Sequence, residues 1–440
     1  MRATADSQAL SLQQYGHQRF SMRNYLAHAL EGGCYMGGIA FLAEETVLPA
    51  MFASLGAPTW LIAHAPVLMM LGFVLPSLFT AHIFERRERM IPFLLVSGIF
   101  QRLPFLIGAL MLFFFAADMP VLTMVVVAAV PFCSGLFGGL GGPAWMELTS
   151  KILPPNRRAS SLAIRMVTGA LIGICAGYVV EAVLARHPGA TGYGILHLCT
   201  FGFLVASYVL FTLQREAPDR RRASAPRIGL WQNLRSLPVL LRAHPELRRL
   251  MITIACALSV WIVVPFMALH AKQSLGLPDA FIGRLVVAQM IGMVAGNLVG
   301  GLIGDRFGGR AMFQMALVGE LAVFVGCNVA GSELGFQTVF FLWGAAFNLH
   351  RLGGFILSME VVPVDRRPTG LAMMGLVNAP GLLLMTTIGG QLQTWLPGDG
   401  QRVLIPALVA GSFTLVALWA LAGVRRPAGI PVGDRTDSEA

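Results

Sequence analysis

The sequence contains twelve long apolar segments, and these constrain the fold more than any other feature. They lie near residues 26–50, 60–83, 91–116, 119–145, 160–185, 193–213, 250–270, 281–303, 310–331, 335–359, 369–393 and 402–423. An apolar helix of about 20 residues spans the hydrocarbon core of a bilayer. Hydrophobic residues make up 56% of the chain and charged residues 12%, against roughly 45–50% and about 25% in soluble domains. The composition excludes a soluble globular enzyme and predicts an all-α membrane protein.

The chain has a net charge of +10, and the positions of its basic residues indicate its topology in the membrane. Of the 32 basic residues, 25 lie in the two tails and in the loops that follow the even-numbered segments. Only Arg186, Lys272 and Arg402 lie in the opposite loops. Because cytoplasmic loops are enriched in Lys and Arg, we expect both termini and the long middle loop in the cytoplasm. We therefore do not expect nucleic acid as a partner.

A break in hydropathy divides the twelve segments into two groups of six. We expect the following domains: a cytoplasmic tail (1–24), a six-helix bundle (25–214), a basic cytoplasmic linker (215–249), a second six-helix bundle (250–424) and a cytoplasmic tail (425–440). In the linker, leucines at near-helical spacing between residues 230 and 241 predict an amphipathic helix on the inner leaflet, although a solvated helix explains them equally well. The first 24 residues lack the apolar stretch of a secretory signal, so we expect no cleaved leader.

Two motifs recur in the second half of the chain. The turns after the fourth and tenth segments both read P-x-x-R-R, and their arginines are Arg157, Arg158, Arg366 and Arg367. Corresponding arginines are 209 residues apart. An acidic residue followed by arginine ends the second and eighth segments, as Glu85-Arg86 and Asp305-Arg306, 220 residues apart. Internal repeats of this kind build many secondary transporters, with the substrate site between the halves.

The turn after the eighth segment resembles the signature G-x-x-x-D-R-x-G-R-R of the major facilitator superfamily. The matching residues are Gly301, Asp305, Arg306, Gly308 and Arg310, and Gly309 replaces one basic residue. The copy at 81–90 keeps its acidic residue and two arginines but has lost both glycines. The resemblance covers roughly residues 25–424. It implies twelve transmembrane helices in two pseudo-symmetric six-helix bundles, and transport by alternating access.

The resemblance also implies a cytoplasmic gate. In this family, loop 8–9 lies against the start of helix 5 and loop 2–3 lies against helix 11. A carboxylate is stabilised at a helix N-terminus, so we expect Asp305 to approach one basic turn and Glu85 the other. The expected gate residues are Glu85, Arg86, Arg157, Arg158, Gly301, Asp305, Arg306, Gly308, Arg310, Arg366 and Arg367. The alternative is that these residues only fix the topology.

Glycines recur at every fourth position in the fifth and eighth segments. They are Gly169, Gly173, Gly177, Gly292, Gly296 and Gly300. Such spacing gives a helix one flat face that another backbone can approach closely. Because helices 5 and 8 touch across the domain boundary in the family, we expect these glycines between the two bundles. Static packing within a bundle explains the same spacing.

Ionisable residues inside membrane segments are costly and mark functional sites. The resemblance implies that helices 1, 5 and 10 line a central cavity. We therefore expect a substrate and proton cavity formed by Glu44, Glu45, Arg165, Asn348, His350 and Arg351. Burial favours the protonated form of a carboxylate and a neighbouring arginine favours the ionised form, so such a pair can exchange a proton. A permanent structural ion pair is the alternative.

Other polar residues receive supporting roles. We expect Gln101, Arg102 and Glu320 to hold the cavity charges from outer helices, and His28 and Glu31 to lie at the membrane interface. The six cysteines are scattered in apolar segments without the spacing of a metal or redox site. We expect no metal ion and no cofactor.

These observations predict a monomeric secondary transporter of a small organic solute in a bacterial inner membrane. The chain has no G-x-x-x-x-G-K-S/T motif for ATP, and neither H-E-x-x-H nor G-x-S-x-G for an enzyme. Because acidic and basic groups share the expected cavity, proton-coupled export is our first expectation. The alternatives are uptake of a sugar or an organic anion, with Arg165 and Arg351 binding the anion, and a non-transporting accessory protein of the same fold.

Overall fold

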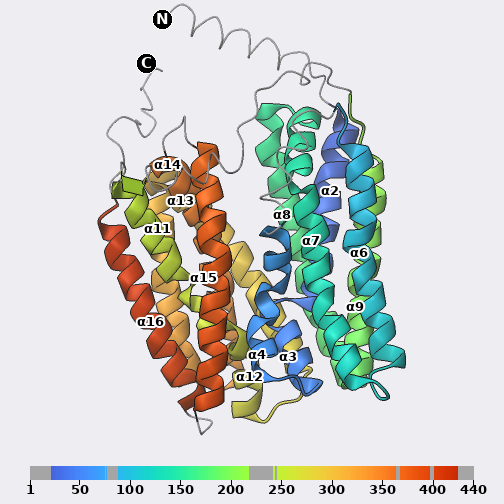
Figure 1. The fold of residues 1–440 in the computed structure, drawn as a ribbon, viewed down its shortest axis with the longest axis vertical. Helices are drawn as coiled ribbons and strands as arrows, with labels where there is room; N and C mark the ends of the chain where they lie inside the picture. Colours follow the sequence, from blue (N-terminus) through green and yellow to red (C-terminus); the bar gives the residue numbers. More distant parts are fainter. Residues whose placement is uncertain are drawn as a thin grey trace, which may run out of the picture. The chain divides into compact units, whose positions relative to one another are not determined.

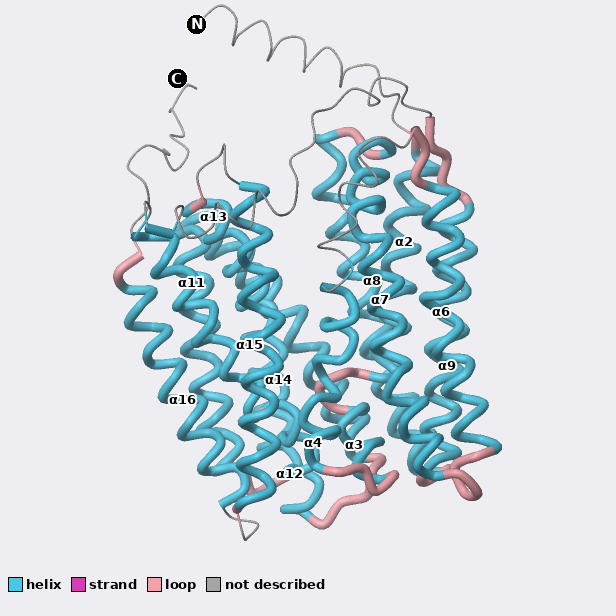
Figure 2. Tube along the Cα trace, viewed as in Figure 1, coloured by secondary structure: helices cyan, strands magenta, loops and turns pink. Residues whose placement is uncertain are grey.

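The computed structural model describes residues 21–74, 76, 88–217, 241–242, 245–362, 367–396 and 401–424. All regular secondary structure in this part of the chain is helical (Figures 1 and 2). The elements are α2 (Met22–Ile39), η1 (Ala40–Leu42), α3 (Val47–Ser54), α4 (Thr59–His64), η2 (Ala65–Val67), α6 (Ile91–Phe114), α7 (Pro120–Ile152), α8 (Pro155–Arg186), α9 (Ala190–Thr212), α11 (Pro245–Ala257), η4 (Leu258–Ile262), α12 (Val264–Leu275), α13 (Phe281–Val329), α14 (Glu333–Val361), α15 (Arg367–Trp395) and α16 (Gln401–Ala422).

Ten helical segments of the described residues are long and apolar enough to cross a membrane. They account for ten of the predicted segments. The second predicted segment contains a shorter apolar helix, Thr59–Val74, and the eleventh coincides with α15. The all-α membrane fold with twelve helices in two six-helix bundles is therefore confirmed. Residues 230–240 of the predicted linker helix, residues 1–20 of the first tail and the whole second tail lie outside the described residues, whereas residues 241–242 are helical.

The chain divides into two compact units, each of which includes a short segment from the other half of the sequence. The first lies within Met1–Ala57, Ala65–Leu230 and Pro278–Val287, and the second within Pro58–His64, Trp231–Leu277 and Ala288–Ala440. In the first unit, the Arg284 guanidinium lies 2.7 Å from the Glu181 carboxylate. In the second, His64 Nε2 lies 3.2 Å from the Thr387 hydroxyl. The domain boundaries expected near residues 214 and 250 stay a prediction.

The first long helix of each half is interrupted. In the first half, α2 tightens into η1, and a turn at residues 43–46 separates it from α3. In the second half, α11 continues into η4, and α12 follows. Pro49 and Pro265 lie in the first turns of α3 and α12. Proline lacks an N–H and is accommodated best in the first turn of a helix, so Pro49 and Pro265 fit the places where α3 and α12 begin.

In the second unit, α13 and α14 approach so closely that their backbones touch. A Cβ atom at Gly292 would overlap the carbonyl oxygen of Phe341, and one at Gly344 would overlap that of Gln289. Glycine at both positions removes the side chains that would hold the helices apart. The two helices therefore pack through main-chain surfaces.

The first unit repeats this arrangement. A Cβ atom at Gly72 would overlap the carbonyl oxygen of Phe132, and one at Gly135 would overlap that of Met69. The first glycine lies 220 residues before its counterpart in α13, and the second lies 209 residues before its counterpart in α14. These offsets equal those of the sequence motifs. The repeat therefore extends from the turns to the packing of the helices.

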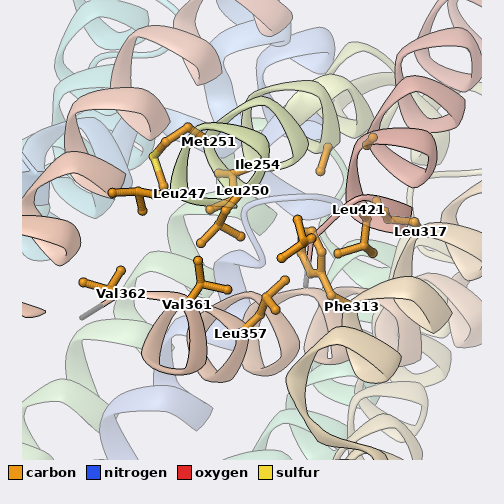
Figure 3. Close-up of a cluster of buried hydrophobic side chains, with 13 residues drawn as sticks. Leu247, Leu250, Met251, Ile254, Phe313, Leu317, Leu357, Val361, Val362 and Leu421 are labelled. Atoms are coloured by element: carbon orange, nitrogen blue, oxygen red, sulfur yellow. The ribbon is translucent and has the colours of Figure 1, made fainter. Parts of the chain in front are cut away.

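Each unit also contains an apolar core. In the second unit, buried side chains of α11, α13, α14 and α16 converge on one cluster, which includes Leu250, Phe313, Leu357 and Leu421 (Figure 3). In the first unit, a cluster that includes Leu148 joins α7 to neighbouring helices. These clusters fix how the helices pack within each unit.

A carboxylate with a buried side chain caps the start of α6 in the first unit. Glu216 accepts hydrogen bonds from the backbone N–H groups of Met90 (2.6 Å) and Ile91 (2.9 Å), where α6 begins. Its other oxygen lies 3.1 Å from Lys151 Nζ. In the second unit, Glu360 accepts a hydrogen bond from Gly309 N–H at 3.0 Å. Unpaired N–H groups at a helix start favour a negative charge, so both carboxylates stabilise helix ends.

We expect Glu216→Gln to lower the free energy of unfolding by about 1–2 kcal/mol, because the helix start and Lys151 both lose a negative partner. Reversible unfolding of the full chain in detergent micelles measures the change. Glu246→Gln is the matched control, since Glu246 is partly exposed and lies 3.8 Å from Arg249; we expect it to cost less than about 0.5 kcal/mol. Equal losses in the two variants would contradict the capping role.

Candidate functional site

The first unit contains a cavity of about 520 Å³, formed mainly between α2, α6, α7, α8 and α9. Its volume lies in the range of about 300–1,000 Å³ that is usual for small-molecule sites. Most of its lining is apolar, with rings from Phe73, Phe137, Trp145, Tyr208 and Phe211. The charged residues that line it are Glu31, Arg102 and Arg165.

A buried ion pair joins α2 to α8 at this cavity. Arg165 Nη1 lies 2.6 Å from Glu31 Oε2, and Ser207 donates to Glu31 Oε1 at 3.2 Å. Glu31 is 5% exposed and Arg165 is 8% exposed. The arginine fits against α2 because the next residue is Gly32, where a Cβ atom would overlap the guanidinium. The sequence Glu-Gly at residues 31 and 32 thus supplies both the charge and the space for its partner.

A second guanidinium anchors α6 to α9. Arg102 donates to the carbonyl oxygens of Leu204 (2.7 Å) and Gly98 (2.9 Å) and to the Ser207 hydroxyl (3.2 Å). Ser207 is therefore shared between Arg102 and the ion pair. Beside Arg102, Gln101 donates to the Tyr35 hydroxyl at 2.9 Å. Side chains from α2, α6, α8 and α9 form one connected polar network at the cavity wall.

His28 of α2 is connected to this network through its carbonyl oxygen, which accepts from Arg165 Nη1 at 3.5 Å. Its ring nitrogens lie 3.0 Å from the Ser161 hydroxyl and 3.3 Å from the Thr149 hydroxyl. The ring stacks on Trp145 with centroids 5.5 Å apart. Both His28 and Glu31 are buried among the helices, on a helix that begins at Met22, four residues before the predicted segment. Their expected location at the membrane interface stays a prediction.

The structure divides the predicted cavity set between several places. Arg165 lines the cavity, as expected, but its carboxylate partner is Glu31. Glu44 and Glu45 are half-buried on the turn between η1 and α3, so the helical spacing that we assumed for them does not apply. Glu44 lines a separate, much smaller pocket that His197 also lines.

The remaining three members of that set lie on α14 in the second unit. His350 Nδ1 lies 2.7 Å from Glu320 Oε1, and Glu320 is fully buried on α13. Asn348 donates to the carbonyl oxygen of Met293 at 2.7 Å, and the Arg351 guanidinium lies over the Phe347 ring at 5.7 Å. Glu320 thus holds His350 from an adjacent helix, which is the contact that a supporting role requires.

Two of the predicted gate arginines bind helix C-termini. Arg158 donates to the carbonyl oxygens of Leu153 (3.0 Å) and Ser150 (2.7 Å) at the end of α7. Arg310 donates to those of Val424 and Ala422, both at 2.9 Å, at the end of α16. Positive charges are favourable there. These bonds fix helix ends within each unit.

The signature turn itself requires a glycine. Gly308 has φ 78° at the kink inside α13, a conformation that side chains disfavour. Beside it, the Arg306 guanidinium lies 5.4 Å from the centre of the Phe307 ring, and Gly301 has open space around it. Arg157 is exposed at the start of α8.

The structure does not describe the side chains of the other predicted gate residues. Glu85, Arg86 and Arg366 lie outside the described residues, as do the side chains of Asp305 and Arg367. The expected approach of Asp305 and Glu85 to the basic turns therefore stays a prediction.

The predicted interdomain glycines pack in several ways. Gly169 lies against Met36 of α2 and Gly173 is buried in α8, whereas Gly177 lies against Val287 of α13, which is the contact between the fifth and eighth helices that we expected. Gly292, Gly296 and Gly300 all face residues of α14. The close approach that these last three permit is to a helix of the same unit, whereas we expected it to be to the other bundle.

Among the described residues, no three His, Cys, Asp or Glu side chains gather so that they could hold a metal ion. The described cysteines are free thiols, dispersed over the helices.

Comparisons with known proteins agree on the fold. The model of the Major Facilitator Superfamily matches residues 249–438. Uncharacterized proteins of Mycobacterium tuberculosis and Mycobacterium bovis are 24% identical over 422 residues, which cover 93% of this chain and 78% of each relative.

Three solved transporters have a similar structure. A D-xylose-proton symporter superposes with a TM-score of 0.71 and 12% identity, covering 92% of this chain and 98% of its own. The nucleoside transporter NupG gives a TM-score of 0.69 at 13% identity, covering 91% and 99%. A bacterial homologue of the iron transporter ferroportin gives 0.65 at 13% identity, covering 92% and 99%. The second half of the chain thus matches the Major Facilitator Superfamily model, and the whole chain is an integral multi-pass membrane protein with the fold of these solved transporters.

Proposed function

We propose that this protein is a proton-coupled secondary transporter that moves a small organic solute across a bacterial inner membrane by alternating access. The cavity of the first unit is the solute site, and Glu31 with Arg165 forms the proton-linked pair. The protein acts as a monomer, with both termini in the cytoplasm as the distribution of basic residues predicts. The observation that carries the proposal is the buried Glu31–Arg165 pair at the wall of a ligand-sized cavity.

In this proposal the Glu31 carboxylate alternates between two states. When ionised, Glu31 pairs with Arg165 and accepts the Ser207 hydroxyl. When protonated, it releases the guanidinium, because the attraction between the charges is lost. Intramembrane carboxylates of this kind often serve proton relays. One of the similar structures is named a proton symporter, which supports proton coupling in this chain as well.

Proton flux in proteoliposomes tests the function. A fluorescent pH indicator inside the vesicles reports proton movement when sugars, nucleosides, organic acids or amines are added under an imposed pH gradient. We expect at least one class to drive proton flux, and Glu31→Gln to abolish that flux while solute binding remains. Reversal of the gradient distinguishes the export first expected from uptake. Solute movement that ignores the gradient in the wild type would contradict proton coupling.

The alternative of an accessory protein gives a different result. A non-transporting protein would move neither protons nor any solute of the panel, and would retain a partner at a fixed ratio through purification. That outcome would overturn the transport proposal as a whole.

A further inference from the structure

We infer that the solute of the first-unit cavity is an organic anion with an apolar body, and that it crosses the membrane together with a proton. This inference rests on the proposed function, since it concerns the same cavity. It is carried by the charge balance of the cavity, by the unused donors of one arginine and by the apolar lining.

The cavity carries an excess positive charge. The guanidinium groups of Arg102 and Arg165 line it, together with a single carboxylate, that of Glu31. Arg102 is solvated by carbonyl and hydroxyl oxygens, which satisfy its donors but do not neutralise it. Placing a charge away from water is costly unless an opposite charge accompanies it. A cation would add to this excess, whereas an anion can replace Glu31 as the negative partner of Arg165 when Glu31 is protonated.

Arg165 has donors to offer such an anion. Its Nη1 bonds to Glu31 and, at 3.5 Å, to the carbonyl oxygen of His28. Its Nε and Nη2 groups make no hydrogen bond to any described residue. The guanidinium is held over the Trp145 ring at 5.1 Å, and the residue is 8% exposed. A fixed planar guanidinium recognises two oxygens of a carboxylate, sulfonate or phosphate at once.

The remaining lining selects an apolar body. Rings, methionines and leucines dominate the walls, among them Phe73, Leu94, Phe137 and Phe211. A sugar would leave many hydroxyls against these walls without partners, and each unpaired buried hydroxyl is unfavourable. An aromatic or branched hydrocarbon carrying one acidic group satisfies both the walls and the guanidinium.

Competition for Arg165 couples the anion to a proton. An anion that binds the guanidinium weakens the attraction that keeps Glu31 ionised, so Glu31 takes up a proton from the same side of the membrane. When the anion leaves on the other side, Arg165 pairs with Glu31 again and the proton is released there. Binding of each favours binding of the other, as linkage requires. The two therefore move in one direction, which favours uptake over the export first expected.

Several titratable groups surround Glu31 and can influence its proton. Arg165 approaches from α8, and Arg102 and Tyr208 from α6 and α9. On α2 itself the neighbours are His28, Cys34 and Tyr35. Glu44 also interacts electrostatically with Tyr35. His28 is the imidazole among these groups, so the test includes it.

A matched series of ligands tests the charge. Naphthalenesulfonate, naphthalenesulfonamide and naphthylmethylammonium share one apolar body and carry a negative, a neutral and a positive group. The sulfonate stays ionised at every working pH, so any pH dependence of its binding belongs to the protein. We expect calorimetric titration in zwitterionic lipid nanodiscs to show binding of the sulfonate, with weaker binding of the amide and none of the ammonium.

The pH dependence and two variants test the coupling. With one proton taken up per anion, the affinity for the sulfonate should rise about tenfold per pH unit on acidification, over the range in which Glu31 exchanges its proton. Glu31→Gln should bind the sulfonate tightly with no pH dependence. Arg165→Gln in the Glu31→Gln background should lose binding at least tenfold, without leaving an unpaired buried charge.

Control variants separate this result from general effects. Arg186→Gln changes an exposed arginine at the far end of α8 and should leave binding unchanged. His28→Gln should keep the pH slope; loss of the slope in this variant alone would overturn the assignment of the proton to Glu31. Stronger binding of the ammonium, or no binding of the sulfonate, would overturn the inference. The proposed function would still stand if another solute class drove proton flux in vesicles.

Discussion

Arg165→Ala is expected to lower the free energy of unfolding by about 3–5 kcal/mol, because it leaves the Glu31 carboxylate buried without its positive partner. The loss comes from the unpaired charge more than from the pair itself, since the attraction within a buried pair is largely offset by the cost of removing both charges from water. Removing both charges should therefore be much less harmful than removing one.

The Glu31→Gln/Arg165→Gln double variant provides that comparison. We expect it to recover most of the stability, and fluorescence-detected unfolding in mixed micelles measures both variants against the wild type. Arg186→Ala, at an exposed position of the same helix, should change the free energy of unfolding by less than about 0.5 kcal/mol. If the double variant is as unstable as Arg165→Ala, the site is not a buried charge pair.

Gly344→Val is expected to separate α13 from α14 and to lower the free energy of unfolding by about 1–3 kcal/mol or more. Its side chain would meet the backbone of Gln289, which cannot move aside without moving the helix. Gly135→Val makes the equivalent change in the first unit, at the carbonyl of Met69. Because the two sites are repeats of one arrangement, we expect similar losses from both.

Gly301→Ala is the control for these substitutions. It also adds a side chain to α13, but no atom beyond the helix's own backbone lies within 4 Å of the added carbon. Because alanine favours a helix over glycine by roughly 0.5–1 kcal/mol, stability should hold or rise slightly. The same unfolding assay compares the three variants. If Gly301→Ala lowers the free energy of unfolding as much as Gly344→Val does, the loss comes from replacing a glycine in a helix and not from the contact between α13 and α14.

The sequence was sufficient to predict the fold. Spans of about 20 apolar residues can cross a bilayer only as helices in a chain of this kind, and the two offsets between the motifs reappear as offsets between packing contacts. The discontinuity of the first span was harder to predict. Pro49 lies within this span, but the apolar run continues through it. Hydropathy reports the composition of a segment and does not report which backbone hydrogen bonds are absent from it.

The site was predicted only in part. Arg165 was identified because a lone arginine in an apolar segment requires a partner, yet that partner was sought among Glu44 and Glu45. The apolar run begins near residue 26, which predicts Glu31 close to the interface, whereas the burial of Glu31 by α8 and α9 is a tertiary effect that hydropathy does not report. The spacing of the α13 glycines predicted a flat face, but spacing alone does not say which helix meets it.

The broken first helices also have a mechanical consequence. A continuous helix transmits a tilt at one end along its whole length, whereas a rod divided by a turn bends at the joint. In the first half, the joint at residues 43–46 separates α2, which carries Glu31, from α3. A displacement of α2 by a few degrees can therefore be absorbed at the joint, so that the segment beyond it keeps its own packing while the helix that carries Glu31 tilts.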